Sequence, residues 1–147
     1  MHVYIINGPN LNLLGTREVE IYGLCSFDDF LPTLQVRFPE VEFSFFQSNV
    51  EGELINALHE AAGIADAVIL NGAAYTHTSI ALGDAVAAIS IPVVEVHISN
   101  IYSRETFRKN SFTAAHCAGV ITGFGMEGYA LAVQYLTQKK SSGRGAG

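Results

Sequence analysis

The sequence predicts an α/β fold with three layers, in which a doubly wound, five-stranded parallel sheet lies between two layers of helices. Two observations predict it. Short apolar runs rich in β-branched and aromatic residues alternate with longer helical patterns, which is typical of βαβ units in a parallel sheet. The chain has 147 residues, the usual length of one domain, and contains no internal repeat.

Five segments have the composition of buried strands. After His2, the first consists of β-branched and aromatic residues alone. Pro92 stands directly before the fourth, at a position that needs no backbone N–H. The predicted strands cover residues 2–6, 41–47, 67–70, 93–98 and 119–122. Because they alternate with helices, we expect the flavodoxin-like arrangement, with helices on both faces of the sheet.

Helices are predicted between these strands and after the last. Ser26 with Asp29 three residues later is a helix-start signal, but Pro32 inside the pattern predicts a late start or a kink. Residues 141–147 have lost almost all apolar side chains, so we expect a single domain over 1–140 and a disordered C-terminal tail. The other predicted helices cover 51–63, 127–138 and a segment that Thr78 or Ser79 caps and that ends near 89.

Composition limits the partners of the chain. Hydrophobic residues make up 49% of the sequence and the mean hydropathy is +0.27, so we expect a homo-oligomer that covers the surplus apolar surface. A net charge of −6 with eight Lys and Arg argues against nucleic acid or an anionic membrane as partner. Cys25 and Cys117 match no metal or redox spacing, and no signal peptide or membrane span is visible, so we expect a cytoplasmic protein with reduced thiols.

Polar motifs follow three of the predicted strands, over residues 7–15, 75–79 and 95–100. The carboxyl ends of parallel strands meet along one edge of a sheet, where ligands bind. Side chains that are far apart in sequence therefore converge there. The sequence thus predicts an active site for a small molecule.

Glu95 and His97 are two residues apart on a strand, so their side chains face the same side. A buried carboxylate and imidazole can simply satisfy each other. We prefer an acid–base role for His97, with Glu95 orienting it or a nearby arginine. A metal site is the third alternative, for which the nearest further ligands are His77 and Asp84, but no zinc spacing is present.

Other polar groups lie at the same edge. His77 can cap a helix, or it can join Asn71 in recognising hydroxyl groups on a polyol ring. The backbone N–H groups of Ile98 and Ser99, at the end of the fourth strand, can bind a carboxylate.

The long predicted loop over residues 7–24 carries Arg17 and Tyr22. Loops of this length in a compact domain tend to be functional. Both residues can be ordinary solvated loop residues, but a guanidinium stabilises a nearby phenolate, so the pair is also a credible proton-abstracting unit. Arg104 and Arg108, four residues apart, can form a cationic patch on one helical face.

Binding modules with a similar topology lack support. Residues 8–15 have no Lys-Ser/Thr pair of a phosphate-binding loop and no GxGxxG pattern. A phospho-receiver module needs an acidic cluster where Asn7 stands.

The lysines of the chain argue against an imine mechanism. Such a mechanism needs a desolvated lysine, and the lysines lie in a loop and near the tail: Lys109, Lys139 and Lys140.

Four ordered motifs give a specific resemblance. They are NGPNLNLLGTRE over 7–18, IYG over 21–23, THTS over 76–79 and EVHISN over 95–100, followed by Arg104-Glu105 and Phe107-Arg108. Over roughly residues 3–138 the chain resembles the type II 3-dehydroquinate dehydratases. The resemblance implies a flavodoxin-like fold, no cofactor or metal, and elimination of water from 3-dehydroquinate to give 3-dehydroshikimate through an enolate.

The resemblance also implies catalytic roles. Tyr22 would remove the proton next to the substrate ketone, and Arg17 would hold Tyr22 as phenolate. Asn10 would position a water molecule against the enolate. His97 would protonate the departing hydroxyl, with Glu95 in support.

Binding roles follow in the same way. Asn71, His77 and Arg108 would bind substrate hydroxyls, and the backbone of Ile98 and Ser99 the carboxylate. The family usually assembles as a dodecamer of trimers. Arg104 would support the residues that act on the substrate. Asp84 would reach into the active site of a neighbouring subunit.

Overall fold

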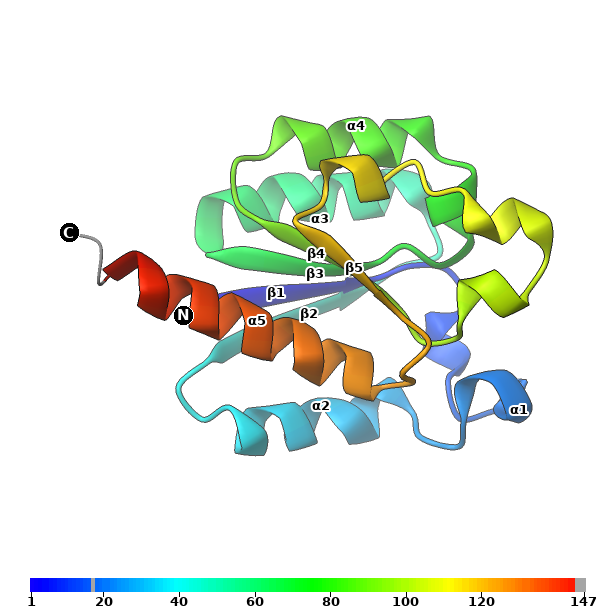
Figure 1. Cartoon of the computed structure of the whole chain (residues 1–147), viewed down its shortest axis with the longest axis horizontal. Coiled ribbons are helices and arrows are strands. Elements are labelled where there is room, and N and C mark those ends of the chain that lie inside the picture. Colours follow the sequence, from blue (N-terminus) through cyan, green and yellow to red (C-terminus); the bar gives the residue numbers. More distant parts are fainter. Residues whose placement is uncertain (17, 145–147) are drawn as a thin grey trace.

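A five-stranded parallel sheet forms the centre of the protein (Figure 1). The structure, a computed structural model, describes residues 1–16 and 18–144. The strands lie in the order β2-β1-β3-β4-β5, which is the flavodoxin-like order and confirms the predicted fold class. Their bounds are β1 His2–Asn7, β2 Glu42–Gln47, β3 Ala67–Asn71, β4 Val93–His97 and β5 Gly119–Thr122.

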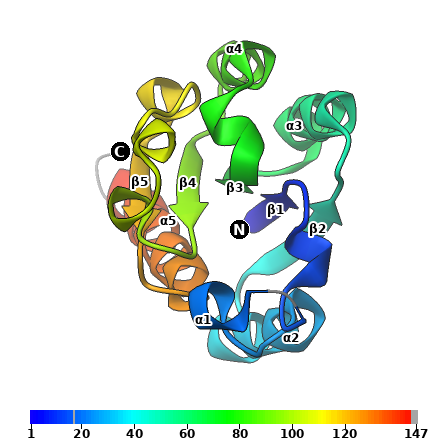
Figure 2. The ribbon, with the colours of Figure 1, turned by 90° about the vertical axis from the view of Figure 1, so that its right-hand side faces the viewer.

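Helices cover both faces of the sheet. Figure 2 looks onto the edge where the strands end, with α3 and α4 on one face and α2 and α5 on the other. The α-helices are α1 Val19–Tyr22, α2 Phe27–Arg37, α3 Glu51–Ile64, α4 Ile80–Ala88 and α5 Glu127–Arg144. Short 3₁₀ helices lie in the loops: η1 Leu11–Leu13, η2 Ala73–His77, η3 Ile101–Ser103, η4 Thr106–Lys109 and η5 Ala114–His116.

The core has two halves because side chains alternate along each strand. On the central strand β1, Val3 and Ile5 pack on the face covered by α2 and α5. Tyr4 and Ile6 pack on the face covered by α3 and α4. Both halves are closely buried, so the strand ends that carry the polar motifs stand on a rigid support.

Two predicted elements differ from the structure. The α2 helix starts at Phe27, directly after Ser26, whose hydroxyl accepts a hydrogen bond from the Asp29 N–H. The helix continues through Pro32, so its start is not late. The α5 helix runs to Arg144, beyond the predicted boundary at residue 140, and the last predicted tail residues, 145–147, lie outside the described residues.

Several smaller expectations are also settled. Cys25 and Cys117 are free thiols, as their spacing predicted. Among the described residues, no helix is long and apolar enough to cross a membrane. The predicted loop over residues 7–24 contains η1 and α1.

The first loop meets the loop after β3 at a close backbone contact. The Gly8 N–H donates to the Asn71 carbonyl oxygen at 2.7 Å. A Cβ atom on Gly8 would lie 2.5 Å from the Gly72 carbonyl oxygen, so only glycine fits here. This contact joins the start of the motif over residues 7–15 to the end of β3, from which the chain leads into the motif over residues 75–79.

Candidate active site

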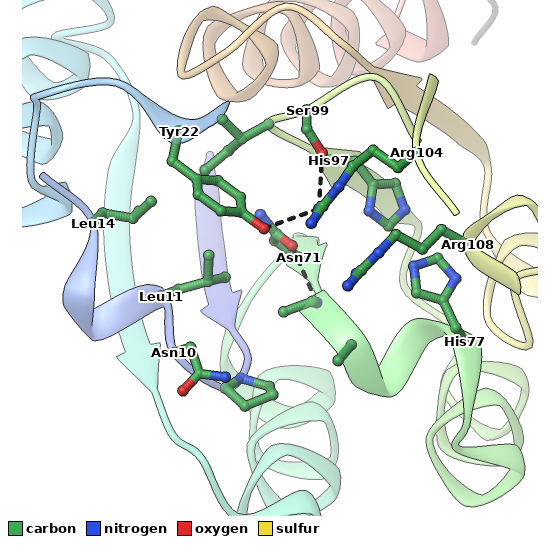
Figure 3. Close-up of a pocket in the computed structure, with 14 residues that line it drawn as sticks. Asn10, Leu11, Leu14, Tyr22, Asn71, His77, His97, Ser99, Arg104 and Arg108 are labelled. Atoms are coloured by element: carbon green, nitrogen blue, oxygen red, sulfur yellow. Dashed lines mark hydrogen bonds between the residues drawn. The ribbon is translucent and has the colours of Figure 1, made fainter. Parts of the chain in front are cut away.

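A pocket lies at the edge of the sheet where β1, β3 and β4 end (Figure 3). Between β1 and β3 the strand order reverses direction along the chain, the position where open parallel sheets bind ligands. The walls come from the first loop, α1 and the loops after β3 and β4. The predicted site residues that line the pocket are Asn10, Tyr22, Asn71, His77, His97, Ile98, Ser99, Arg104 and Arg108.

Three predicted residues do not line this pocket or cannot be placed. Asp84 is exposed on α4 and does not line it. Glu95 is fully buried behind His97 and contacts the ring from the protein side. Arg17 lies outside the described residues.

His97 and Glu95 form a buried pair at the end of β4. Glu95 Oε2 lies 2.9 Å from His97 Nε2, and His97 is 5% exposed. Because the carboxylate accepts from Nε2, the other ring nitrogen, Nδ1, is the one left for a further partner. Each residue of the pair is the hydrogen-bond partner of the other. His97 also lines the pocket, so the acid–base interpretation fits the geometry.

Two hydroxyl groups hold the other side of the carboxylate. Ser111 Oγ donates to Glu95 Oε1 at 2.9 Å, and Thr113 Oγ1 donates to the same oxygen. Burial alone raises the pKa of Glu95, but the hydrogen bonds from His97, Thr113 and Ser111 outweigh it and keep this pKa below its usual value. Glu95 is therefore a fixed anion behind the imidazole.

The structure offers no support for a metal site among the residues that it describes. Among the residues that the structure describes, no three His, Cys, Asp or Glu side chains lie together in a way that could hold a metal ion. The pair of Glu95 and His97 has hydroxyl groups around it instead.

The ring of His77 lies beside that of His97 on one side of the pocket, with the two ring centroids 6.0 Å apart (Figure 3). It does not cap α4, because the side chain of Ser79 accepts from the Leu82 N–H there. His77 Nδ1 donates to the Asn110 carbonyl oxygen at 2.7 Å. Burial and the positive charges of its neighbours lower the pKa of His77, so its ring is neutral at pH 7 and Nε2 is a hydrogen-bond acceptor.

Arg104 links Tyr22 to the end of β4. Its Nη1 donates to Tyr22 Oη at 3.0 Å and to Ser99 Oγ at 3.3 Å. The guanidinium carbon also lies 5.7 Å from the centre of the Tyr22 ring. A cation thus lies against the phenol oxygen, on the pocket side of α1.

Arg108 supplies a second cation to the pocket. Its Nε donates to Glu105 Oε2 at 2.7 Å, which fixes the side chain in η4. Arg104 and Arg108 do not share a helix as the sequence suggested, because η3 ends before Arg104 and η4 starts after it. Both still line the same pocket.

Asn10 enters the pocket from the first loop. It adopts a left-handed conformation with φ 68°, and its N–H donates to Asn49 Oδ1 at 2.9 Å. Leu11 and Leu14 beside it are buried in the core under α2 and α5. These two leucines fix the first loop to the body of the protein.

Sequence reasoning missed four residues that support this site. Ser111 and Thr113 bind Glu95 from a loop that carries no recognisable motif. Asn7 and Tyr129 lie below the pocket in a hydrogen-bonded group with Asn71. For Tyr129 a signal existed, because a tyrosine on a buried helix face needs a partner for its hydroxyl.

Comparison with known proteins decides the family. The profile of the family described as dehydroquinase class II matches residues 1–137. The chain belongs to the class II dehydroquinase family. Two relatives named 3-dehydroquinate dehydratase support this. One, from Exiguobacterium sp., is 56% identical over 139 residues, which cover 94% of this chain and 95% of that protein. The other, from Fusobacterium nucleatum, is 53% identical over 144 residues, covering 94% and 97%.

Solved class II dehydroquinase structures have the same fold. The type II dehydroquinase from Butyrivibrio crossotus superposes with a TM-score of 0.90 at 41% identity, covering 93% of this chain and 97% of that one. The type II dehydroquinase from Propionibacterium acnes gives 0.89 at 39% identity, covering 93% and 96%. The resemblance seen in the motifs is thereby confirmed for the family and the fold.

Proposed function

We propose that this chain is a 3-dehydroquinate dehydratase, which removes water from 3-dehydroquinate to give 3-dehydroshikimate, in the shikimate pathway or in quinate catabolism. One observation carries the proposal. A phenol and an imidazole line one pocket, and each has a charged partner: Arg104 lies 3.0 Å from Tyr22, and Glu95 lies 2.9 Å from His97. The printed names of the relatives support the same reaction.

Tyr22 is the proposed base. Proton abstraction next to a ketone needs a strong base that is ionised near neutral pH, and a phenolate beside a guanidinium meets both needs. Arg104 supplies such a cation. By the resemblance, Arg17 acts with it. When the phenolate takes the proton, the electron pair of the broken C–H bond becomes an enolate, against which Asn10 holds a water molecule.

His97 is the proposed general acid of the second step. The enolate collapses to the conjugated enone, and the C–O bond to the departing hydroxyl breaks. A proton from His97 leaves with that hydroxyl as water. Glu95 balances the positive charge of the imidazolium before the transfer. The sequence of events is a stepwise anti elimination without a metal or cofactor, and the proton on Tyr22 returns to His97 before the next turnover.

The remaining pocket residues are the proposed substrate ligands. Asn71 offers an amide, and neutral His77 an acceptor nitrogen, to ring hydroxyls. Arg108 adds a charged donor. The backbone of Ile98 and Ser99 is proposed to hold the carboxylate, since oriented N–H groups at a strand end bind anions.

We also propose a homo-oligomer, a dodecamer of trimers in which Asp84 reaches the site of a neighbouring subunit. Asp84 is exposed on α4 and does not line the pocket of its own chain, which leaves it available to a second one. Light scattering at the assay concentration tests this, because an active monomer would contradict it. Exposed apolar side chains also support an oligomer, because a subunit contact would cover them. They include Ile80, Phe107, Phe112 and Phe124.

The decisive assay adds 3-dehydroquinate to the purified chain and follows the ultraviolet absorbance of the conjugated enone. A chelator is present throughout, since the proposal needs no metal. His97→Ala is the matched control, and its kcat should fall by about 10²–10⁴-fold. Absence of enone formation by the folded wild-type chain would refute the proposed function.

A further inference from the structure

Below the pocket, one buried hydroxyl joins the ends of two strands. Asn7 and Asn71 are register partners on β1 and β3. Asn71 Nδ2 donates to Tyr129 Oη at 2.9 Å, and Tyr129 Oη donates to Asn7 Oδ1 at 2.8 Å. Tyr129 comes from α5, on the side of the sheet away from α3 and α4. Tyr129 and Asn7 have no exposed surface, and Asn71 is 3% exposed.

The direction of these hydrogen bonds is fixed at one end. The Ala73 N–H donates to Asn71 Oδ1 at 3.2 Å (Figure 3). A backbone N–H can only donate, so this bond sets which end of the Asn71 amide is oxygen. The amide nitrogen must then face Tyr129, whose hydroxyl accepts from it and turns its own proton toward Asn7. Asn71 is thereby held at both ends and keeps one orientation toward the pocket.

We propose that Tyr129 is a positioning residue, which fixes the side-chain amide of Asn71 so that it presents one defined donor and one defined acceptor to a hydroxyl-bearing substrate. The inference rests on the proposed function, because it assigns Asn71 to substrate binding. Each amide group retains capacity for a second hydrogen bond, one proton on Nδ2 and one lone pair on Oδ1. A rotated amide would present the wrong group at each place.

Packing alone does not account for a tyrosine at this position. The ring contacts Phe27, with centroids 5.1 Å apart, and Phe30 at 6.1 Å. A phenylalanine at 129 would make the same apolar contacts. The hydroxyl is the added feature, and both of its protein partners are strand-end asparagines. Burial raises the pKa of Tyr129, so the hydroxyl stays protonated and able to donate.

A double-mutant cycle tests the proposal. Tyr129→Phe should raise the KM for 3-dehydroquinate by about 10-fold with a smaller change in kcat, since a binding contact is weakened in both ground and transition states. In the Asn71→Ala background, Tyr129→Phe should have no further effect on KM. Tyr4→Phe is the matched control, because its hydroxyl contacts Glu60 and Tyr4 does not line the pocket; its KM should match wild type.

A merely structural role gives a different result. If Tyr129→Phe raised KM by the same factor with and without Asn71, or left KM unchanged, the proposal would be overturned. A wild-type chain that does not dehydrate 3-dehydroquinate would refute the proposed function instead. The positioning role would still be decided by NMR, in which the Nδ2 protons of Asn71 should exchange slowly in wild type and faster in Tyr129→Phe.

A second variant covers the case in which Tyr129→Phe does not fold. Asn7→Ala keeps the bond from Asn71 to Tyr129 but removes the acceptor of the Tyr129 proton. It should speed exchange of the Asn71 amide protons and raise KM by about 3-fold, again only when Asn71 is present. Unchanged exchange in a folded Asn7→Ala variant would count against the proposal.

Discussion

The two halves of the candidate site are built in opposite ways. The strand-end cluster, Asn71, Glu95 and His97, is buried to 95% or more. Hydrogen bonds from other elements hold Asn71 and Glu95, and Glu95 in turn holds His97. The first loop, residues 8–16 and 18–26, brings Asn10 and Tyr22. Its helix α1 has no buried residue, and Leu24 is 80% exposed.

The difference separates two requirements of one reaction. The side chains of the strand-end cluster must keep a fixed charge and a fixed orientation toward the pocket. A buried hydrogen-bond network provides both. The proposed base, Tyr22, would have to meet the substrate after the substrate has entered, and an exposed segment such as α1 can move to allow entry. Substitutions in the cluster should therefore change both stability and activity, whereas substitutions in α1, the part of the first loop that carries Tyr22, should change activity with little effect on stability.

Tyr22→Phe should have the largest effect of all on activity. Removing the proposed base should lower kcat by about 10³-fold. Stability should hardly change, because α1 buries no residue and the ring of phenylalanine keeps the apolar contacts. Turnover under substrate saturation and the midpoint of thermal unfolding are the two measurements. If kcat stayed near wild type, or if the midpoint fell by more than a few degrees, the contrast between loop and cluster would break down.

Glu95→Gln should lower kcat by about 10²-fold and also destabilise the fold. The pKa of Glu95 is below its usual 4.5 in the folded chain. Ionised Glu95 therefore stabilises the fold above about pH 4.5, and this contribution disappears as the pH falls through the folded pKa. Urea unfolding at pH 7 and pH 3.5 should show a smaller gap between wild type and Glu95→Gln at the lower pH.

Thr113→Val is the matched control for this change, since it keeps the carboxylate and the shape of residue 113 but removes one hydrogen bond to Glu95. It should cost about 1–2 kcal/mol of stability at pH 7 and reduce kcat far less than Glu95→Gln. A gap between wild type and Glu95→Gln that widened toward low pH would contradict the assigned ionisation.

The site residues that lie at the ends of strands can be predicted from the sequence. A buried strand has a strong apolar signature, and Asn71 and His97 are placed as soon as the ends of β3 and β4 are known. Parallel topology then brings those ends to one edge. The strand bounds predicted from these apolar runs agree with the observed bounds to within one residue.

The supporting residues escape such reasoning because their partners depend on tertiary packing. Thr113 precedes η5 and reaches Glu95 only because the loop after η4 folds back over β4. Tyr129 is 58 residues from Asn71 along the chain. The sequence pattern also predicts too short an α5, since polar residues near the end of this helix give no apolar pattern. In these cases local pattern carries no information on the contact.

Gly15→Ala tests the first loop without touching a proposed catalytic group. Gly15 has φ +89°, and a Cβ atom there would lie 2.8 Å from the Leu24 carbonyl oxygen. Gly15 and Leu24, which precede and follow α1, would have to move apart, so kcat/KM should fall by about 10-fold.

Gly23→Ala is its control. Gly23 has φ +82°, but a Cβ atom there meets nothing within 4 Å, so both variants place an alanine at positive φ and only Gly15→Ala adds a steric clash. Activity of Gly23→Ala should lie between that of wild type and Gly15→Ala. Equal losses in both would mean that backbone strain, and not the contact between Gly15 and Leu24, sets the position of the loop.

The smallest expected effect lies at the edge of the strand-end cluster, at Ala73. Its φ of +50° is left-handed, which costs an alanine about 1–2 kcal/mol relative to glycine. Glycine also raises the entropy of the unfolded chain, at a cost of about 0.5–1 kcal/mol. Ala73→Gly should therefore be as stable as wild type or up to about 1.5 kcal/mol more stable, whereas Ala74→Gly, next in η2 without positive φ, should lose about 0.5–1 kcal/mol.

Measuring activity as well as stability shows whether residue 73 also positions Asn71 for the substrate. The Ala73 N–H holds Asn71 Oδ1, so a more flexible residue 73 should loosen the amide and raise KM by about 2–3-fold, although stability is kept. Ala74→Gly also alters the pocket lining, but it should change KM less than Ala73→Gly, because the Ala74 N–H makes no bond to Asn71 among the described contacts. Urea unfolding and initial rates on the two variants give both quantities. If Ala73→Gly lost as much stability as Ala74→Gly, the left-handed conformation would carry no strain. An unchanged KM in Ala73→Gly would mean that Asn71 is held by Tyr129 alone.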